Sequence, residues 1–380
     1  MKSFIAIIVL LATLAVSYSE QSEAERCSLT NCLITDGCKC SSWDSPIDQS
    51  QTPQFVTLAF NEAINERNYH FYYKYLLDFK NADGSKVGAT FYIPHEYTDY
   101  DLVNRLYNSG AEIAVHSISR NPLTSYWQEA NEDTLVEEFN GQRILISKFA
   151  NIPFEKIVGA RTPNLAINGD TTFSAYKKSG ILYDNSWPTV HYNRFFPYTL
   201  DYKSLQMCPI GVCPTGSFPG MWVLPMIDHV SKTGAVCNAL STCITDAESP
   251  EDVKNWLMEQ FQRHYTYQRA PITLNIDANF FEVGEHNYKG FKLFLTELEK
   301  YEDVYMVSHK EVQDWNANPV PFNRYSRPPP NDSASCSPIM CELQKGDEIR
   351  YMRSCTVCPA MYPWVGNPLG EIITEASNNC

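Results

Sequence analysis

The 380-residue sequence lacks an excess of basic residues, with 30 Lys and Arg against 44 Asp and Glu and a formal net charge of −14 at pH 7. A partner that carries many negative charges, such as nucleic acid or an anionic membrane surface, requires a basic face on the protein. The composition therefore argues against both kinds of partner.

Long apolar runs are lacking beyond the first residues. Met1 to Ser3 form a short positive region, and the apolar run 4–16 that follows ends in small residues, which is the pattern of a secretory signal peptide. This run is shorter than the ~18 to 20 residues that a membrane span requires. We therefore predict a signal peptide at 1–17, cleaved after Ser17 or Ser19, and a secreted, extracellular protein without a membrane segment.

The sequence contains thirteen cysteines, which suits an oxidising compartment. Four of them lie between Cys27 and Cys40, in a lead-in that spans 27–53, and we expect them to form disulfides, with a zinc site as the alternative. Because thirteen is an odd number, at least one thiol has no partner within the chain. A disulfide-linked dimer is therefore one of the expected states.

From 54 to 316 short strand-like runs alternate with amphipathic helical patterns. The candidate strands span 54–60, 88–93, 112–115, 157–160, 181–184, 272–276 and 304–307. The candidate helices span 68–79, 98–108, 132–149, 171–178, 250–268, 288–300 and 308–315. This alternation predicts an α/β fold whose parallel sheet is either open or closed into a barrel, and periodicity does not choose between the two.

Residues 201–245 interrupt the alternation and are predicted to form an insertion held by two local disulfides, Cys208 with Cys213 and Cys237 with Cys243. The chain becomes Pro-rich over 317–335, as expected of a stiff linker.

The linker carries Asn331, which starts the only N-glycosylation acceptor pattern and is expected to be exposed. A cysteine-rich tail follows at 336–380 and is predicted to be a disulfide-held appendage or a carbohydrate-binding patch.

Several short stretches carry a family resemblance. They are Phe60-Asn61-Glu62-Ala63, His116-Ser117-Ile118-Ser119-Arg120, Arg161-Thr162-Pro163, Leu182-Tyr183-Asp184 and Phe196-Pro197-Tyr198-Thr199-Leu200-Asp201-Tyr202. In these the chain resembles polysaccharide deacetylases of the NodB-homology kind, carbohydrate esterase family 4, and within them the secreted insect-type chitin deacetylases. The resemblance implies a distorted (β/α) barrel with a groove at the carboxyl ends of its strands. It also implies a metal-dependent N-deacetylase, with chitin or chito-oligosaccharides as partners.

The first two motifs of this family are altered here. Asn61 stands where the family has a catalytic Asp base, and a carboxamide has no basic site near neutral pH. Glu62 stands at a metal-ligand position, and His116 keeps the first of two family imidazoles that lie one helical turn apart. Arg120 replaces the second imidazole, and a guanidinium stays protonated and cannot bind a cation. We expect Arg120 to form an ion pair with Glu62 where the metal belonged.

The remaining motifs are partly retained. Arg161, which orients the base in the family, and Asp184 are both present. Asn164 replaces a Tyr whose backbone amide contributes to the oxyanion hole, a role that a backbone can keep. Asp277 stands where the family has a His as general acid, and an Asp with an ordinary pKa is ionised and a poor proton donor at neutral pH.

These substitutions predict a secreted, catalytically impaired chitin deacetylase-like protein that keeps its groove and binds chitin or chito-oligosaccharides. No metal is expected, although zinc would be the cofactor if the family site were retained. Glu62, His116 and Asp277 would form a replacement ligand set that suits zinc or manganese. One alternative is an active metal-dependent N-deacetylase that uses shifted ligands. The other is an extracellular interaction protein that binds no glycan and uses its insertion or its tail.

Overall fold

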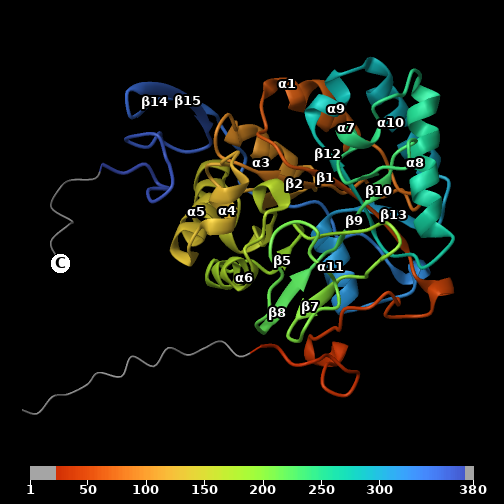
Figure 1. The fold of residues 1–380 in the computed structure, drawn as a ribbon. Helices are drawn as coiled ribbons and strands as arrows, with labels where there is room; N and C mark the ends of the chain where they lie inside the picture. Colours follow the sequence, from red (N-terminus) through yellow and green to blue (C-terminus); the bar gives the residue numbers. More distant parts are fainter. Residues whose placement is uncertain (1–22, 373–380) are drawn as a thin grey trace, which may run out of the picture.

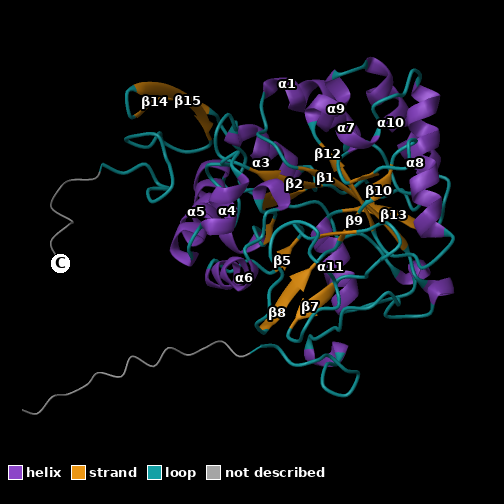
Figure 2. Cartoon of the chain, in the orientation of Figure 1, coloured by secondary structure: helices purple, strands orange, loops and turns teal. Residues whose placement is uncertain are grey.

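A computed structural model describes residues 23–372 of the chain (Figure 1). The predicted signal peptide at 1–17 and Cys380 lie outside the described residues, so the disulfide-linked dimer stays a prediction. A sheet of nine strands is surrounded by helices (Figure 2), which confirms the predicted α/β class. Its strands are β1 (Gln54–Phe60), β2 (Thr90–Ile93), β3 (Glu112–Val115), β4 (Gly159–Ala160), β5 (Tyr183–Asp184), β7 (Tyr198–Leu200), β8 (Phe218–Val223), β12 (Ile272–Ile276) and β13 (Val304–Val307).

The sheet is parallel except at one edge. Its strand order is β12-β1-β2-β3-β4-β5-β8-β7, with β13 also paired to β1, and only β7 runs antiparallel to its neighbour. All residues of β1 are buried, as expected for a strand covered on both faces. Among the described strands no ladder joins β7 to β12, but β9 (Met226–Ile227) lies against β12 and the imidazole of His229 contacts the carbonyl of Thr273 at 3.1 Å. These contacts link the segment after β8 to β12, so the sheet approaches closure as a distorted barrel.

The helices pack around this sheet. They are α1 (Glu66–Asn68), α2 (Lys74–Leu76), α3 (Tyr100–Asn108), α4 (Thr124–Glu129), α5 (Glu132–Ala150), α6 (Gly169–Lys178), α7 (Leu240–Cys243), α8 (Pro250–Tyr265), α9 (Ala278–Glu282), α10 (Glu285–Leu298) and α11 (His309–Ala317). Ser249 and Ser308 form capping boxes at the starts of α8 and α11, because each hydroxyl accepts a hydrogen bond from the third residue of its helix. The predicted helix at 68–79 is instead broken by a π-helical stretch, Tyr69–Tyr73.

The segment 201–245 contributes to the main sheet, because β8 lies within it and pairs in parallel with β5. Disulfides join Cys208 to Cys213 and Cys237 to Cys243. The segment also forms parts of two small ladders, β6 (Pro188–Thr189) with β9 and β10 (His229–Val230) with β11 (Val236–Cys237). The segment is therefore part of the main sheet and not only an insertion at the edge of the barrel.

The two cysteine-rich ends are also cross-linked. In the lead-in, disulfides join Cys27 to Cys40 and Cys32 to Cys38, so these sulfurs are not free to bind zinc. In the tail, the hairpin of β14 (Ile339–Lys345) and β15 (Glu348–Ser354) is held by Cys336–Cys355 and Cys341–Cys358. Tyr362 packs on His95 of the barrel at a ring distance of 4.5 Å. The tail is thus docked on the domain.

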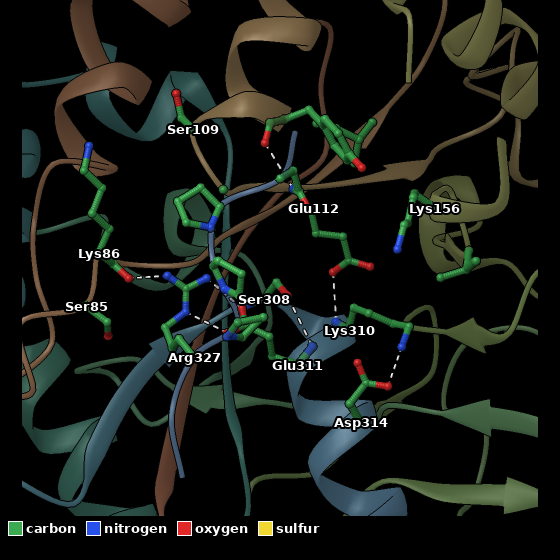
Figure 3. Close-up of a pocket in the computed structure, with 18 of the residues that line it drawn as sticks. Ser85, Lys86, Ser109, Glu112, Lys156, Ser308, Lys310, Glu311, Asp314 and Arg327 are labelled. Atoms are coloured by element: carbon green, nitrogen blue, oxygen red, sulfur yellow. Dashed lines mark hydrogen bonds and ion pairs between the residues drawn. The ribbon is translucent and has the colours of Figure 1, made fainter. Parts of the chain in front are cut away.

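A cavity of about 760 Å³ lies where several strands begin (Figure 3). Glu112, the first residue of β3, and Leu182, which precedes β5, are in its wall, together with the Pro-rich residues 327–331. We call this the amino-end cavity. In parallel α/β folds catalytic groups gather at the other end of the strands, so this cavity is not the expected place for the chemistry.

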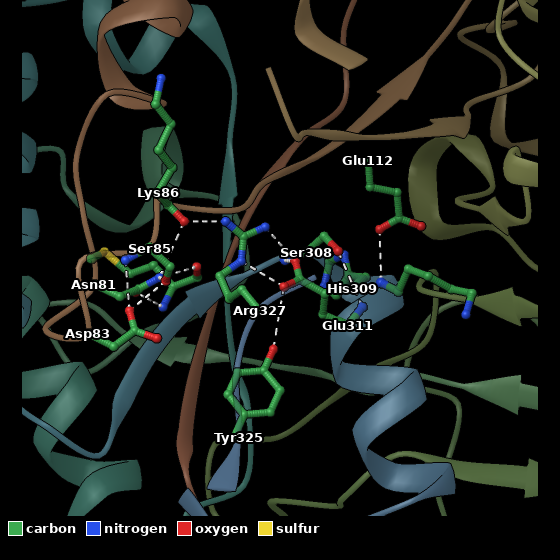
Figure 4. Close-up of polar contacts among 12 residues, drawn as sticks. Asn81, Asp83, Ser85, Lys86, Glu112, Ser308, His309, Glu311, Tyr325 and Arg327 are labelled. Carbon is green, nitrogen blue, oxygen red and sulfur yellow. Dashed lines mark hydrogen bonds and ion pairs between the residues drawn. The ribbon is translucent and has the colours of Figure 1, made fainter. Parts of the chain in front are cut away.

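The Pro-rich segment is fastened to the domain by Arg327, whose guanidinium forms two hydrogen bonds with the Glu311 carboxylate, at 2.7 and 2.9 Å (Figure 4). Asn331 is half-buried, and its amide donates to the carbonyl oxygens of Tyr107 and Ala111 at 3.1 and 3.0 Å. The expectation of an exposed acceptor is therefore wrong, because α3 and the turn after it hold this side chain. A glycan would replace one of the hydrogens that these two bonds use.

Candidate functional site

A second cavity, of about 490 Å³, lies where the parallel strands end, and we call it the carboxyl-end cavity. Asn61 follows β1, His116 follows β3, Arg161 follows β4 and Asn275 belongs to β12. These side chains converge because the carboxyl ends of parallel strands meet at one edge of the sheet. Of the residues predicted for the site, the structure places Asn61, His116, Arg120, Arg161 and Asn164 in the lining, but not Glu62, Asp184 or Asp277.

His116 is a buried imidazole whose Nδ1 lies 2.7 Å from the carbonyl oxygen of Arg161. Because a carbonyl oxygen only accepts, Nδ1 carries the proton and Nε2 keeps its lone pair. Burial first, and then the charge of Arg120, lower the pKa of His116 well below its usual value. The ring is therefore neutral at physiological pH, and its Nε2 can accept a hydrogen bond but not donate one.

Arg161 is a fully buried guanidinium with neutral partners. It donates from Nε to the carbonyl of Asn185 at 3.1 Å, from Nη1 to the Asn275 side chain at 2.8 Å, and from Nη2 to the Asn185 side chain. Its guanidinium carbon also lies 4.2 Å from the centre of the Tyr92 ring. Among the described residues it has no ion pair within 4.0 Å, so a buried positive charge stands here without a contacting carboxylate.

Glu62 and Asp277 meet at the start of α9, beside the cavity. The carboxylate of Glu62 accepts a hydrogen bond from the backbone N–H of Ala278 at 2.8 Å. Asp277 is the N-cap of α9: it accepts from the N–H of Phe280 at 3.0 Å and from the hydroxyl of Ser241 at 2.6 Å. Both carboxylates thus serve the helix N-terminus, which leaves unpaired N–H groups for them to satisfy.

The expected ion pair between Arg120 and Glu62 is wrong, because no such contact within 4.0 Å exists between these two described residues. The segment after His116 is a loop and not a helical turn. The carboxylate of Glu138, in α5, holds this loop by accepting hydrogen bonds from the N–H groups of Ile118 and Ser119 at 3.0 and 2.9 Å. Arg120 itself has a left-handed backbone, with φ of 45°, and an exposed side chain. The loop aims Arg120 into the cavity, whereas Glu62 turns toward α9.

The other two predicted residues have different surroundings. Asp184 is fully buried and accepts hydrogen bonds from the N–H and the hydroxyl of Ser186 at 2.9 and 2.5 Å. Burial raises the pKa of Asp184 to about 6. Asn164 is exposed with φ of 56°, a conformation that Asn tolerates better than most residues, and its amide donates to the carbonyl of Pro122 at 3.1 Å. Asn164 therefore lies in the wall of the carboxyl-end cavity, whereas Asp184 is buried outside its lining.

The donor set does not fit a catalytic divalent cation. Such a site uses about three protein ligands, and here only the Nε2 of His116 faces the carboxyl-end cavity as a free ligand atom. In the described part of the chain, the one group of three or more His, Cys, Asp or Glu ligand atoms within 4.8 Å is Cys27, Cys32 and Cys40, all in disulfides. The alternative set of Glu62, His116 and Asp277 is therefore not assembled.

The unusual protonation of Glu62 can be tested. Burial raises the pKa of this carboxyl to about 8, against a usual value of 4.5, and Asp277 adds to the rise. The folded state then holds a proton that the unfolded state loses, so this stabilisation is present below pH 4.5 and is lost as the pH rises to about 8. One pKa unit corresponds to about 1.4 kcal/mol, so the full shift would contribute roughly 5 kcal/mol to the free energy of unfolding. We expect a smaller contribution because Glu62 is partly exposed.

The variant Glu62→Gln keeps an acceptor for Ala278 and cannot ionise. Urea unfolding at pH 5 and pH 8 should show that the variant gains stability relative to the wild type as the pH rises. A difference between the two proteins that stays constant over this pH range would show that Glu62 is already ionised at pH 5.

Several residues of the site carry no motif signal. Asn121, Asn238 and Asn275 line the carboxyl-end cavity, and Asn185 supports Arg161 from outside it. Asn275 alone had a local signal, because it is a polar residue inside the apolar strand Ile272–Ile276. The others lie in loops whose position depends on distant parts of the chain.

The chain is 37% identical to Chitin deacetylase 8 of Bombyx mori over 382 residues, which cover 98% of this chain and all of that protein. It is 29% identical to Chitin deacetylase 1 of Bombyx mori, over 93% of this chain and 70% of that protein. A solved carbohydrate esterase family 4 pseudoenzyme from Bacillus anthracis is 12% identical, with a TM-score of 0.40 over 70% of this chain and 66% of that chain. No protein-family model matches.

Proposed function

We propose that this chain, which belongs to the chitin deacetylase family of polysaccharide deacetylases, binds chitin or chito-oligosaccharides without deacetylating them by the metal-dependent route. One observation carries the proposal: Arg120, a guanidinium at the position of the second family imidazole, lines the carboxyl-end cavity together with His116. Its positive charge disfavours a divalent cation in the same space by charge repulsion.

The other two chemical roles also lack a suitable group. Deacetylation needs a base to take a proton from water and an acid to protonate the leaving amine. Asn61, at the base position, cannot accept a proton, and Asp277, at the acid position, already accepts hydrogen bonds from Phe280 and Ser241. What remains is a polar cavity at the edge of the sheet, which suits binding without catalysis.

We place this function outside the cell. The described cysteines form six disulfides, an arrangement that oxidising compartments favour. Between residues 23 and 372, the structure contains no helix with both the length and the apolar character of a membrane span.

Three measurements on the purified, secreted protein test the proposal. We expect the protein to be retained on colloidal chitin, to contain no stoichiometric zinc, and to release no acetate from chito-oligosaccharides. An unrelated secreted protein of similar negative charge is the control for retention. Retention no greater than that of the control ends the binding claim, whereas bound zinc together with acetate release shows an active deacetylase.

A further inference from the structure

The lining of the carboxyl-end cavity has one sign of charge. Arg120 and Arg161 are its charged residues, and none of the described residues in its wall is acidic. Its other polar groups are mainly carboxamides, those of Asn61, Asn121, Asn164, Asn238 and Asn275. The cavity volume, about 490 Å³, lies within the range of roughly 300–1,000 Å³ that small-ligand sites occupy.

Arg120 is the group in this wall that is available to an anion. Its side chain is exposed, and none of the described residues accepts a hydrogen bond from its guanidinium. Its backbone N–H, in contrast, is fixed by the hydroxyl of Ser117 at 3.0 Å, which holds the residue in the loop. A guanidinium binds a carboxylate through two parallel hydrogen bonds, and the buried charge of Arg161 adds attraction for the same ligand.

The wall also contains acceptors, and these restrict the ligand further. The Nε2 of His116 carries a lone pair and is open to the cavity, and carboxamide oxygens such as that of Asn61 accept as well. A sulfate or a phosphate monoester dianion has no hydrogen to donate to these atoms, and inorganic phosphate at neutral pH has no more than two. A ligand that carries hydroxyl groups beside its carboxylate satisfies both kinds of group.

We propose that the carboxyl-end cavity binds an acidic sugar, with the carboxylate on Arg120 and ring hydroxyls on His116 and the surrounding carboxamides. This inference goes beyond the proposed function, because chitin contains no acidic sugar, and it depends on the lining of the carboxyl-end cavity and not on retention on chitin. It also predicts that a protonated glucosamine unit, which is a cation, is excluded from this position.

Calorimetric titration with D-glucuronate, D-glucose and acetate at one ionic strength and pH 7 tests the inference. We expect D-glucuronate to bind at least about tenfold more tightly than either of the other two, since the glucose lacks the carboxylate and acetate lacks the hydroxyls. The variant Arg120→Gln should remove the preference for glucuronate over glucose. Arg324→Gln, which removes the same charge from an exposed residue outside the cavity lining, should keep it.

Two results would overturn the inference: a preference for glucuronate that survives Arg120→Gln, or acetate binding as tight as that of glucuronate. Retention on chitin is measured separately and distinguishes the two claims. A protein that discriminates glucuronate but is not retained on chitin contradicts the proposed function and leaves the acidic-sugar site in place. A protein that is retained on chitin but does not discriminate glucuronate contradicts this inference alone.

Discussion

Four replacements made together, Asn61→Asp, Glu62→Asp, Arg120→His and Asp277→His, are expected to give a chain that binds zinc and releases acetate from chito-oligosaccharides. They remove a guanidinium from the carboxyl-end cavity, add a second imidazole beside His116, and supply a base and an acid. General acid and base groups each contribute about 10²–10⁴-fold to a rate, so acetate release should rise at least about 100-fold above the wild-type background. Metal analysis and an acetate assay measure the two effects.

The matched control replaces Arg324, which lies outside the cavity, in place of Arg120. A variant with Asn61→Asp, Glu62→Asp, Asp277→His and Arg324→His carries the same number of changes but keeps the guanidinium beside His116, so we expect neither zinc nor acetate. Asp277→His also removes the N-cap of α9, which costs about 1 kcal/mol, so both variants must first be shown to fold. Activity restored by any single replacement would contradict this account of the substituted site.

Most of the barrel could be predicted because its signals are local. The apolar run of β1 predicts a buried strand. At Ser249 and at Ser308, a Ser followed three residues later by an acidic residue predicts the start of a helix, and the structure has capping boxes there, at the starts of α8 and α11. The strand β8 could not be predicted in this way. Its sequence, Phe218–Val223, contains a Pro and a Gly, and its place in the sheet depends on pairing with β5.

In the site, the sequence predicted which residues converge but not how they pair. The carboxyl ends of the strands bring Asn61, His116 and Arg161 together, and this does not depend on the conformation of the loops. The conformation of Arg120 depends instead on Glu138, a carboxylate of α5 that holds the preceding loop residues. A capping signal was present at Asp277, because an Asp directly before a helix is a frequent N-cap, and the structure has Asp277 as the N-cap of α9.

Arg327→Met is expected to lower the free energy of unfolding by about 3–5 kcal/mol, the cost of leaving one charge of a buried pair without its partner. The side chains of Arg327 and Glu311 are 7% and 8% exposed and are joined by two hydrogen bonds. Gly88 lies directly under the pair: a Cβ at this residue would lie 2.6 Å from the Arg327 guanidinium. Urea unfolding measures the change.

Two further variants separate the buried pair from a general loss of charge. Arg263→Met removes a partly exposed partner of the exposed Glu259, a pair at 2.7 Å, and should cost less than about 1 kcal/mol. The double variant Arg327→Met with Glu311→Met removes both buried charges and should be more stable than Arg327→Met alone, because no carboxylate is left buried and unpaired. If Arg327→Met costs no more than Arg263→Met, the Pro-rich segment is a loose linker, as its composition predicts. A large cost shows that it is a fixed wall of the amino-end cavity.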